Sequence, residues 1–370
     1  MQKKLIALAV AGLMSGGAFA QSNVSISGLF RVGFEQYKLS DTGAASYSAE
    51  NRVSDQSSML EFSGKEDMGN GNYADFLIDQ RFAPDTSVDG GHFGDGNTHV
   101  GIGGAWGALH LGRQDLHYGT MIEGYKVYSL QTILGNGIFA QVNGTTIANG
   151  TRTPNVIFYD TPNMSGLGAR IAYSTQWSAA NPVEGSGLND GSKNGALNVA
   201  LNYINGPIKA GYSYWDAKAE GGVTGQDQRG DTLQFGYAFP MGITAGIAYN
   251  KSRYDTVAGS VAGPEMSRNA WLLPVSYAFG ASQVNVTYAK AGNTSNQAGS
   301  TGAKAWSLGY GYSLSKRTNV GVTYTKLTND AQGQYNLFAI ARPGDTAVGG
   351  AGGPVGSDVS QFYMGITHAF

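Results

Sequence analysis

Cysteine is absent from all 370 residues, which excludes disulfide scaffolds, thiol catalysis and thiolate metal sites. Long apolar runs are also absent, so no membrane-spanning helix is expected, because such a helix needs about 18 consecutive apolar residues. Charged residues make up only 14% of the chain, and no charge block, proline-rich tract or composition shift marks a linker. A single folded unit without a basic face for nucleic acid is therefore predicted.

The first 20 residues have the pattern of a secretory signal peptide. Lys3 and Lys4 form a charged start, an apolar run follows, and Ala18–Ala20 supplies the small residues of a cleavage site. The apolar run is too short to span a membrane. Cleavage is expected to leave residues 21–370. Loss of the two lysines lowers Lys+Arg from 24 to 22 against 26 Asp+Glu, a net charge of −4.

What the chain does contain is glycine (56 residues), tyrosine (21 residues) and a repeated alternation of apolar with small or polar residues. Roughly sixteen stretches of about ten residues alternate in this way, which predicts an all-β, 16-stranded antiparallel transmembrane β-barrel with lipid outside and water inside. One stretch has Val156 and Phe158 as its apolar positions. A weaker one runs from Arg268 to Tyr277 and is interrupted by Pro274.

The connections between these stretches alternate between short and long. Asn205–Gly206 is a two-residue hairpin signal, whereas Ala83–Asn97, Tyr254–Ser267 and Leu327–Val359 are long. Short turns at one end of the strands and long loops at the other are typical of outer-membrane barrels.

The longest irregular connection before the sixth strand covers about residues 115–151. A connection of roughly 35 residues is unusual in a compact domain and is functional or disordered. Its apolar residues, including Ile122, Tyr125, Leu134 and Phe139, argue against disorder. We expect the segment to fold back inside the barrel and narrow the lumen; the alternative is a surface flap or a small separate subdomain.

Several stretches resemble the trimeric general porins of the Gram-negative outer membrane, nearest the neisserial type. They are Phe62–Gly71, Gly107–Gln114, Asn155–Pro162 with Leu167–Gly168, and Met364–Phe370. The resemblance implies a water-filled pore, a homotrimer in outer-membrane lipid and lipopolysaccharide, and a third external loop that bends inward. The terminal Phe370 is expected to serve as a signal to the barrel-assembly machinery.

In this family an acidic loop faces arginines on the barrel wall, and the resemblance implies charges of this kind around the constriction. Arg152 stands at the end of the long segment, as a family arginine does, and Met59 stands where another arginine is expected. The candidate constriction residues are Arg152, Glu123, Asp115, Arg31, Arg81 and Met59. Arg152 is expected to lie opposite Glu123 or Asp115.

Metal and cofactor sites are not expected. Asp85, Asp89, Asp95 and Asn97 offer oxygen ligands in a glycine-rich loop, but their spacing does not match a calcium loop. The five histidines show no zinc spacing, and no motif joins residues into a catalytic set.

Passive diffusion of small hydrophilic solutes and ions is the expected function. One alternative is a substrate-preferring channel for organic or aromatic acids. In that channel Tyr118, Tyr125, Tyr128 and Phe139 would line the path and Arg152 would hold a carboxylate. An outer-membrane hydrolase or adhesin is a third reading, for which no catalytic residues are visible.

Overall fold

The structure is a computed structural model that describes residues 23–40, 49–85, 93–117, 134–147, 152–177, 195–218, 227–258, 261–337 and 355–370. The expected signal peptide, Asp89, Glu123 and the three loop tyrosines lie outside the described residues. Among the described residues, no helix has the length and apolar character needed to cross a membrane.

Antiparallel strands account for most of the described chain. Those of the main sheet are β1 (Asn23–Ser40), β2 (Glu50–Asp55), β3 (Ser58–Gly69), β4 (Asn72–Phe82), β5 (Thr98–Gly104), β6 (Gly107–Asp115), β9 (Arg152–Asp160), β10 (Leu167–Ser174), β11 (Ala196–Asn205), β12 (Ile208–Ala217), β13 (Gln228–Ala238), β14 (Ile243–Ala258), β15 (Val261–Phe279), β16 (Ser282–Ala291), β17 (Ala303–Ser313), β18 (Thr318–Asn329) and β19 (Asp358–Ala369). The long segment adds helix α3 (Leu134–Phe139) and a small hairpin of β7 (Gln141–Val142) and β8 (Thr145–Thr146).

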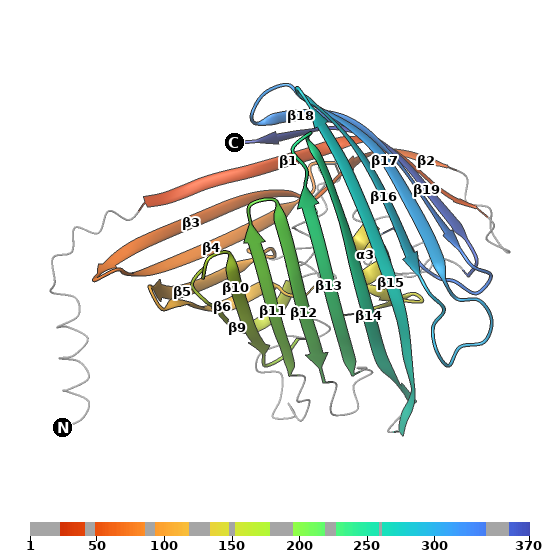
Figure 1. Cartoon of the computed structure of the whole chain (residues 1–370), viewed down its shortest axis with the longest axis horizontal. Helices are drawn as coiled ribbons and strands as arrows, with labels where there is room; N and C mark the ends of the chain where they lie inside the picture. The colour runs from red at the N-terminus through yellow and green to blue at the C-terminus, as the bar shows by residue number, and fades with distance from the viewer. Residues whose placement is uncertain are drawn as a thin grey trace.

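The main sheet closes on itself (Figure 1). It holds 17 strands in the hydrogen-bonded order, but β2 and β3 both pair with β1 and together form one wall strand, so the barrel has 16. The last strand, β19, pairs with the first along twelve positions from Leu29 to Ser40. The predicted closed 16-stranded antiparallel barrel is confirmed.

Alternating burial along the strands separates an outer apolar face from an inner face. On β1, Val24, Ile26, Phe30 and Phe34 are exposed on the outside, whereas Glu35 is buried on the inside. The same alternation holds on β13, where Leu233 and Phe235 are exposed and Thr232 and Gln234 are buried. Because a barrel strand presents lipid-facing and lumen-facing residues in turn, this pattern fits a transmembrane wall.

The sixth wall strand, β9, has its faces reversed relative to the prediction. Val156 and Phe158 are buried, and Ile157 is the exposed residue. Inside the barrel, the Phe158 ring stacks on His110 at 4.8 Å between ring centroids and lies under the Arg170 guanidinium at 4.7 Å. Apolar character therefore assigned the wrong face, because these two side chains pack against neighbouring rings and charges within the barrel.

Two connections and one strand also differ from the sequence prediction. Asn205 pairs with Ile208, so Gly206 and Pro207 are the turn residues, one position later than expected. Strands β14 and β15 extend to Ala258 and from Val261, so most of the expected Tyr254–Ser267 loop is strand. Pro274 does not end β15, although the β14–β15 ladder has no pairing between Ala245↔Val275 and Ala248↔Leu272, where the proline lacks an N–H.

The described part of the long segment packs against the wall of β14 to β17. Helix α3 contacts β15, β16 and β17, and β7 contacts β14 and β15. Figure 1 shows α3 behind β14 and β15. The residues from Ile138 to Ala140, with Val142 and Ile147, are fully buried and belong to the same cluster as Ala270, Ala289 and Ala305 of the wall.

Candidate functional site

Five of the six predicted constriction residues are described, and all five lie in one part of the wall. Arg31, Met59, Arg81, Asp115 and Arg152 come from β1, β3, β4, β6 and β9. In the sheet these strands follow one another, with only β5 inserted between β4 and β6. The sixth residue, Glu123, is outside the described residues.

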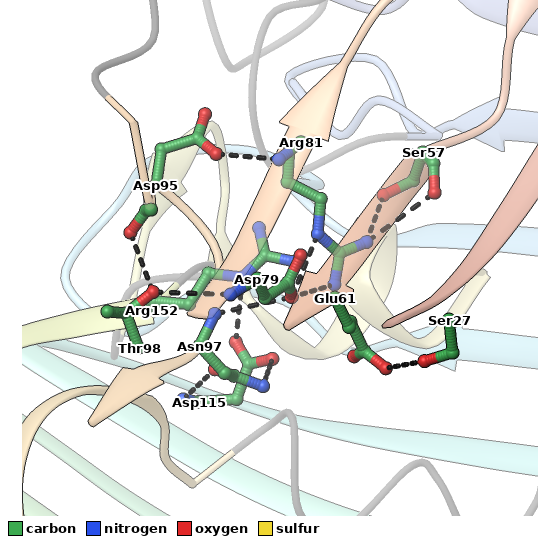
Figure 2. Close-up of polar contacts among 11 residues, drawn as sticks. Ser27, Ser57, Glu61, Asp79, Arg81, Asp95, Asn97, Thr98, Asp115 and Arg152 are labelled. Atoms are coloured by element: carbon green, nitrogen blue, oxygen red, sulfur yellow. Dashed lines mark hydrogen bonds and ion pairs between the residues drawn. The ribbon is translucent and has the colours of Figure 1, made fainter. Parts of the chain in front are cut away.

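Arg152 and Asp115 are neighbours on the same wall (Figure 2). They are register partners where β6 ends and β9 begins, and Arg152 Nε lies 3.6 Å from Asp115 Oδ1. Asn97 fixes the acid from the other side, since its amide donates to Asp115 Oδ2 at 3.2 Å and its Oδ1 accepts from the Asp115 backbone N–H at 2.7 Å. Arg152 therefore lies beside Asp115 on one wall, where the two ends of the long segment meet, and the other expected partner, Glu123, is outside the described residues.

Arg81 is held against a buried acid on its own strand. Its Nη2 and Nε atoms donate to Asp79 Oδ2 at 2.6 and 3.1 Å, and Asp79 is 1% exposed. Its Nη1 donates to Ser57 Oγ at 2.9 Å, while Asp95 accepts a hydrogen bond from its backbone N–H at 2.9 Å. Charge-assisted bonds of this kind fix the guanidinium in place (Figure 2).

Two further ion pairs stand on the same inner wall. Glu35 is fully buried and lies 3.3 Å from Arg52. Arg170 of β10 donates to both carboxylate oxygens of Asp160 of β9, at 2.7 and 2.9 Å. Four wall arginines therefore each have a carboxylate beside them.

Arg31 and Met59 complete the set. Arg31 Nη1 donates to the Gln56 backbone oxygen at 3.3 Å. Met59 is in register with Leu29 on β1 and Arg81 on β4, so it places an uncharged side chain where the family pattern has an arginine.

A polar hollow of about 410 Å³ lies along the inner face of this wall. Its lining residues are Asn97, Gln114, Asp115, Asp160, Thr161, Asn163, Gly168, Ala169, Arg170 and Asn202. Carboxylates, a guanidinium and amides dominate this surface, which suits contact with water and hydrated solutes.

His117 lies against Asn198 of β11, Ser213 of β12 and Thr232 of β13. His117 lies two residues beyond β6 and is fully buried. Its Nδ1 is 2.8 Å from Ser213 Oγ, and its backbone N–H donates to Asn198 Oδ1 at 3.4 Å. Burial lowers the pKa of His117 to about 3, so the ring is neutral at physiological pH.

Arg268 of β15 holds the other described part of the segment. The side chain is 2% exposed, and its Nη2 donates to the backbone oxygens of Ile138, at 2.7 Å, and Phe139. Its Nε donates to the Gln141 oxygen at 2.8 Å, and its Nη1 to Asn250 Oδ1. A guanidinium at the carboxyl end of a helix satisfies carbonyls that the helix leaves unpaired. Arg268 was not among the predicted site residues. The only sign of its role in the sequence is a cation at an inward-facing strand position.

The segment Gln334–Leu337 adds a second layer of contacts. Asn143 Oδ1 accepts from the Gln334 N–H at 2.8 Å, Gln141 donates to the Asn336 oxygen at 3.3 Å, and Asn336 also accepts from Tyr37 at 2.7 Å. The hairpin region is thus held by Arg268 of β15 and by Gln334 and Asn336.

The weaker candidates gain no support as metal sites. Asp85 accepts from the Asp55 N–H at 3.1 Å, whereas Asp95 bonds Arg81. The His99 and His110 rings touch at 4.7 Å, but in the described ranges no group of three His, Cys, Asp or Glu residues is placed to hold an ion. Phe139 is fully buried and does not line an open path.

Comparison with known proteins agrees with this geometry. The family model described as Gram-negative porin matches residues 7–332. Outer membrane porin protein 32 of Delftia acidovorans is 28% identical, over 100% of both chains. A major outer membrane protein P.IB of Neisseria gonorrhoeae is 27% identical over 58% of this chain and 56% of its own.

Among solved structures, the anion-selective porin from Comamonas acidovorans superposes with a TM-score of 0.75 at 21% identity, covering 95% of this chain and all of its own. This likeness concerns the fold. Because the family model spans well over half of the chain, the protein belongs to the Gram-negative porin family and is a channel of the outer membrane.

Proposed function

We propose that the channel passes small hydrophilic solutes and ions by passive diffusion, and that residues 115–151 narrow its lumen. A 16-stranded barrel has room for an aqueous channel. The observation that supports a narrowed lumen is the set of hydrogen bonds from Arg268. This residue belongs to the inner face of β15 and binds backbone carbonyls of the long segment.

We further propose that ion selectivity is weak. Charged rings set selectivity when their charges are unbalanced. Here Arg52, Arg81, Arg152 and Arg170 each stand beside a carboxylate, and Met59 adds no charge. The same pairing disfavours the organic-acid channel, since Asp115 already stands beside the Arg152 guanidinium that would bind a substrate carboxylate.

Reconstitution of the full chain into planar bilayers tests both points. We expect ohmic single-channel steps, and in a tenfold salt gradient a reversal potential close to zero. A reversal potential near the limit for an ideally selective pore would refute weak selectivity, and absence of channel steps would refute diffusion.

For assembly, we propose a homotrimer in which the outward apolar faces of the terminal strands β1 and β19 pack between copies. Exposed Phe34, Met364 and Ile366 lie together there, since Phe34↔Met364 is a register pair. Lipopolysaccharide is the proposed neighbour of the remaining outer face, and the barrel-assembly machinery the proposed reader of Phe370.

A further inference from the structure

Two lysines face each other on the outer wall of the barrel. Lys290 of β16 and Lys304 of β17 are register partners, and both are exposed. Their sequence neighbours Ala289, Ala291 and Ala305 are buried on the inner side, so both lysines point outward. We call Lys290 and Lys304 the outer lysine pair.

The next register pairs of β16 and β17 indicate the depth of the outer lysine pair in the membrane. Tyr288 and Trp306 are the register pair two residues away from the lysines. Val286 and Leu308 form the pair two residues further along. All four are exposed on the outer face. Aromatic residues mark the interface of a transmembrane barrel, and aliphatic residues its hydrocarbon band. The lysines therefore stand just beyond the interface, about 7 Å further along the strands.

This interface belongs to the outer leaflet. The lysines lie where β16 ends and β17 begins, on either side of residues 292–302, one of the long connections. The other end of the same strands carries the short turns, such as that between β17 and β18. Long loops of outer-membrane barrels are extracellular.

Within the described part of the chain, no carboxylate pairs with either lysine. By contrast, Lys326 on the next strand lies 3.2 Å from Asp358, and Arg253 on β14 lies 3.5 Å from Asp231. Like charges directly opposite each other on an antiparallel pair are destabilising. An anion between the two ammonium groups would remove that repulsion.

We propose that the outer lysine pair binds a phosphate of an outer-leaflet glycolipid, with the acyl chains of that lipid against Tyr288, Trp306 and Leu308. The assignment rests on the outer-membrane location of the family and not on the pore itself. Charge complementarity selects the anionic head group, and the aliphatic band directly below selects a lipid over a soluble anion. Strands β16 and β17 are separated from β19 by β18, so the site lies beside the proposed subunit contact.

The test measures glycolipid binding to the folded full chain in detergent by native mass spectrometry. The probes are lipid A with two phosphates and the same lipid after removal of its phosphates. We expect Lys290→Ala/Lys304→Ala to bind bisphosphorylated lipid A roughly thirtyfold more weakly, the effect of two basic residues near an anionic surface. Lys290→Arg/Lys304→Arg should retain binding.

The matched control is Lys316→Ala/Arg317→Ala, which removes two exposed cations at the short-turn end of the neighbouring hairpin. It should bind lipid A as the wild type does. Three outcomes would overturn the proposal: unchanged affinity in Lys290→Ala/Lys304→Ala, equal wild-type affinity for the phosphate-free lipid, or displacement of lipid A by an equal concentration of inorganic phosphate. Retained heat-modifiable migration of each variant shows that it is folded.

Discussion

The Nη2 atom of Arg268 donates a hydrogen bond of 2.7 Å to the backbone oxygen of Ile138, 130 residues earlier in the chain. With the bonds to Phe139 and Gln141, it ties the described part of the long segment to the inner wall of β15. One buried cation thus binds three backbone carbonyls of the described part of the long segment.

Arg268→Gln should loosen the segment. A buried carbonyl left without a donor costs about 1–3 kcal/mol, and this substitution shortens the side chain that serves three of them. We expect noisier open-channel current and altered conductance with an intact barrel, measured on single channels. Arg253→Gln is the control, because Arg253 lies on the neighbouring strand and faces outward. If the open-channel current noise of Arg268→Gln equalled that of Arg253→Gln, the hydrogen bonds of Arg268 would not hold the segment.

The Arg152–Asp115 pair should behave as two compensating charges. Arg152→Ala leaves Asp115 unbalanced and should shift selectivity toward cations, whereas Asp115→Ala should shift it toward anions. Both shifts should shrink between 0.1 M and 1 M salt, where the Debye length falls from about 10 Å to about 3 Å. The double variant should return close to wild type, as judged by reversal potentials. A double variant whose reversal potential stays shifted toward either ion would mean that the two charges do not compensate each other.

Glu123 lies outside the described residues, and its role as an acid of the constriction is still a prediction. Glu123→Ala should move the reversal potential in the anion direction at 0.1 M salt, because one negative charge is lost from the narrowed lumen. A reversal potential identical to that of the wild type would remove Glu123 from the constriction.

Acid should release the start of the long segment. The folded pKa of His117, about 3, lies below the ordinary 6.5, so the unfolded form binds the extra proton between these values. The His117 packing is fully stabilising above pH 6.5 and is lost as the pH falls toward 3. Open-channel noise should therefore rise over this window in wild type. In His117→Asn, which cannot gain the proton, the pH profile should be flat; equal profiles would show that His117 does not control the segment.

Closure of the barrel between the first and last strands, β1 and β19, should depend on Phe370. Gly28 and Phe370 exchange backbone hydrogen bonds of 3.2 and 3.1 Å, and a Cβ on Gly28 would lie 2.2 Å from the Phe370 ring. Deletion of Phe370 should lower the folded yield in the outer membrane, and Gly28→Ala should lower it less, because the ring can rotate away. Gly168→Ala is the control, since nothing lies within 4 Å of its added Cβ. A normal yield of the Phe370 deletion would contradict the assembly role.

The strands were predictable because a barrel imposes period-two alternation on its strands, and β13 shows it from Thr232 to Gly236. The sequence predictions that failed concern residues whose positions depend on contacts distant in the chain. Val156 and Phe158 are apolar yet inward, because His110 and Arg170 pack on Phe158 from other strands. The Arg152–Asp115 geometry follows from the register of β6 with β9, which alternation alone does not determine. Arg268 was missed because its partners are backbone carbonyls 127 to 130 residues away, and a carbonyl leaves no mark in a sequence.

Polymer exclusion in planar bilayers tests the narrowed, water-filled lumen most directly. Polyethylene glycols of increasing mass are added to both sides of single wild-type channels. Polymers small enough to enter should lower the conductance, and those above a cut-off should leave it unchanged. We expect a cut-off well below that of an unobstructed 16-stranded barrel, and a higher cut-off in Arg268→Gln. A wild-type channel that admits polymers as large as an unobstructed barrel would contradict this expectation.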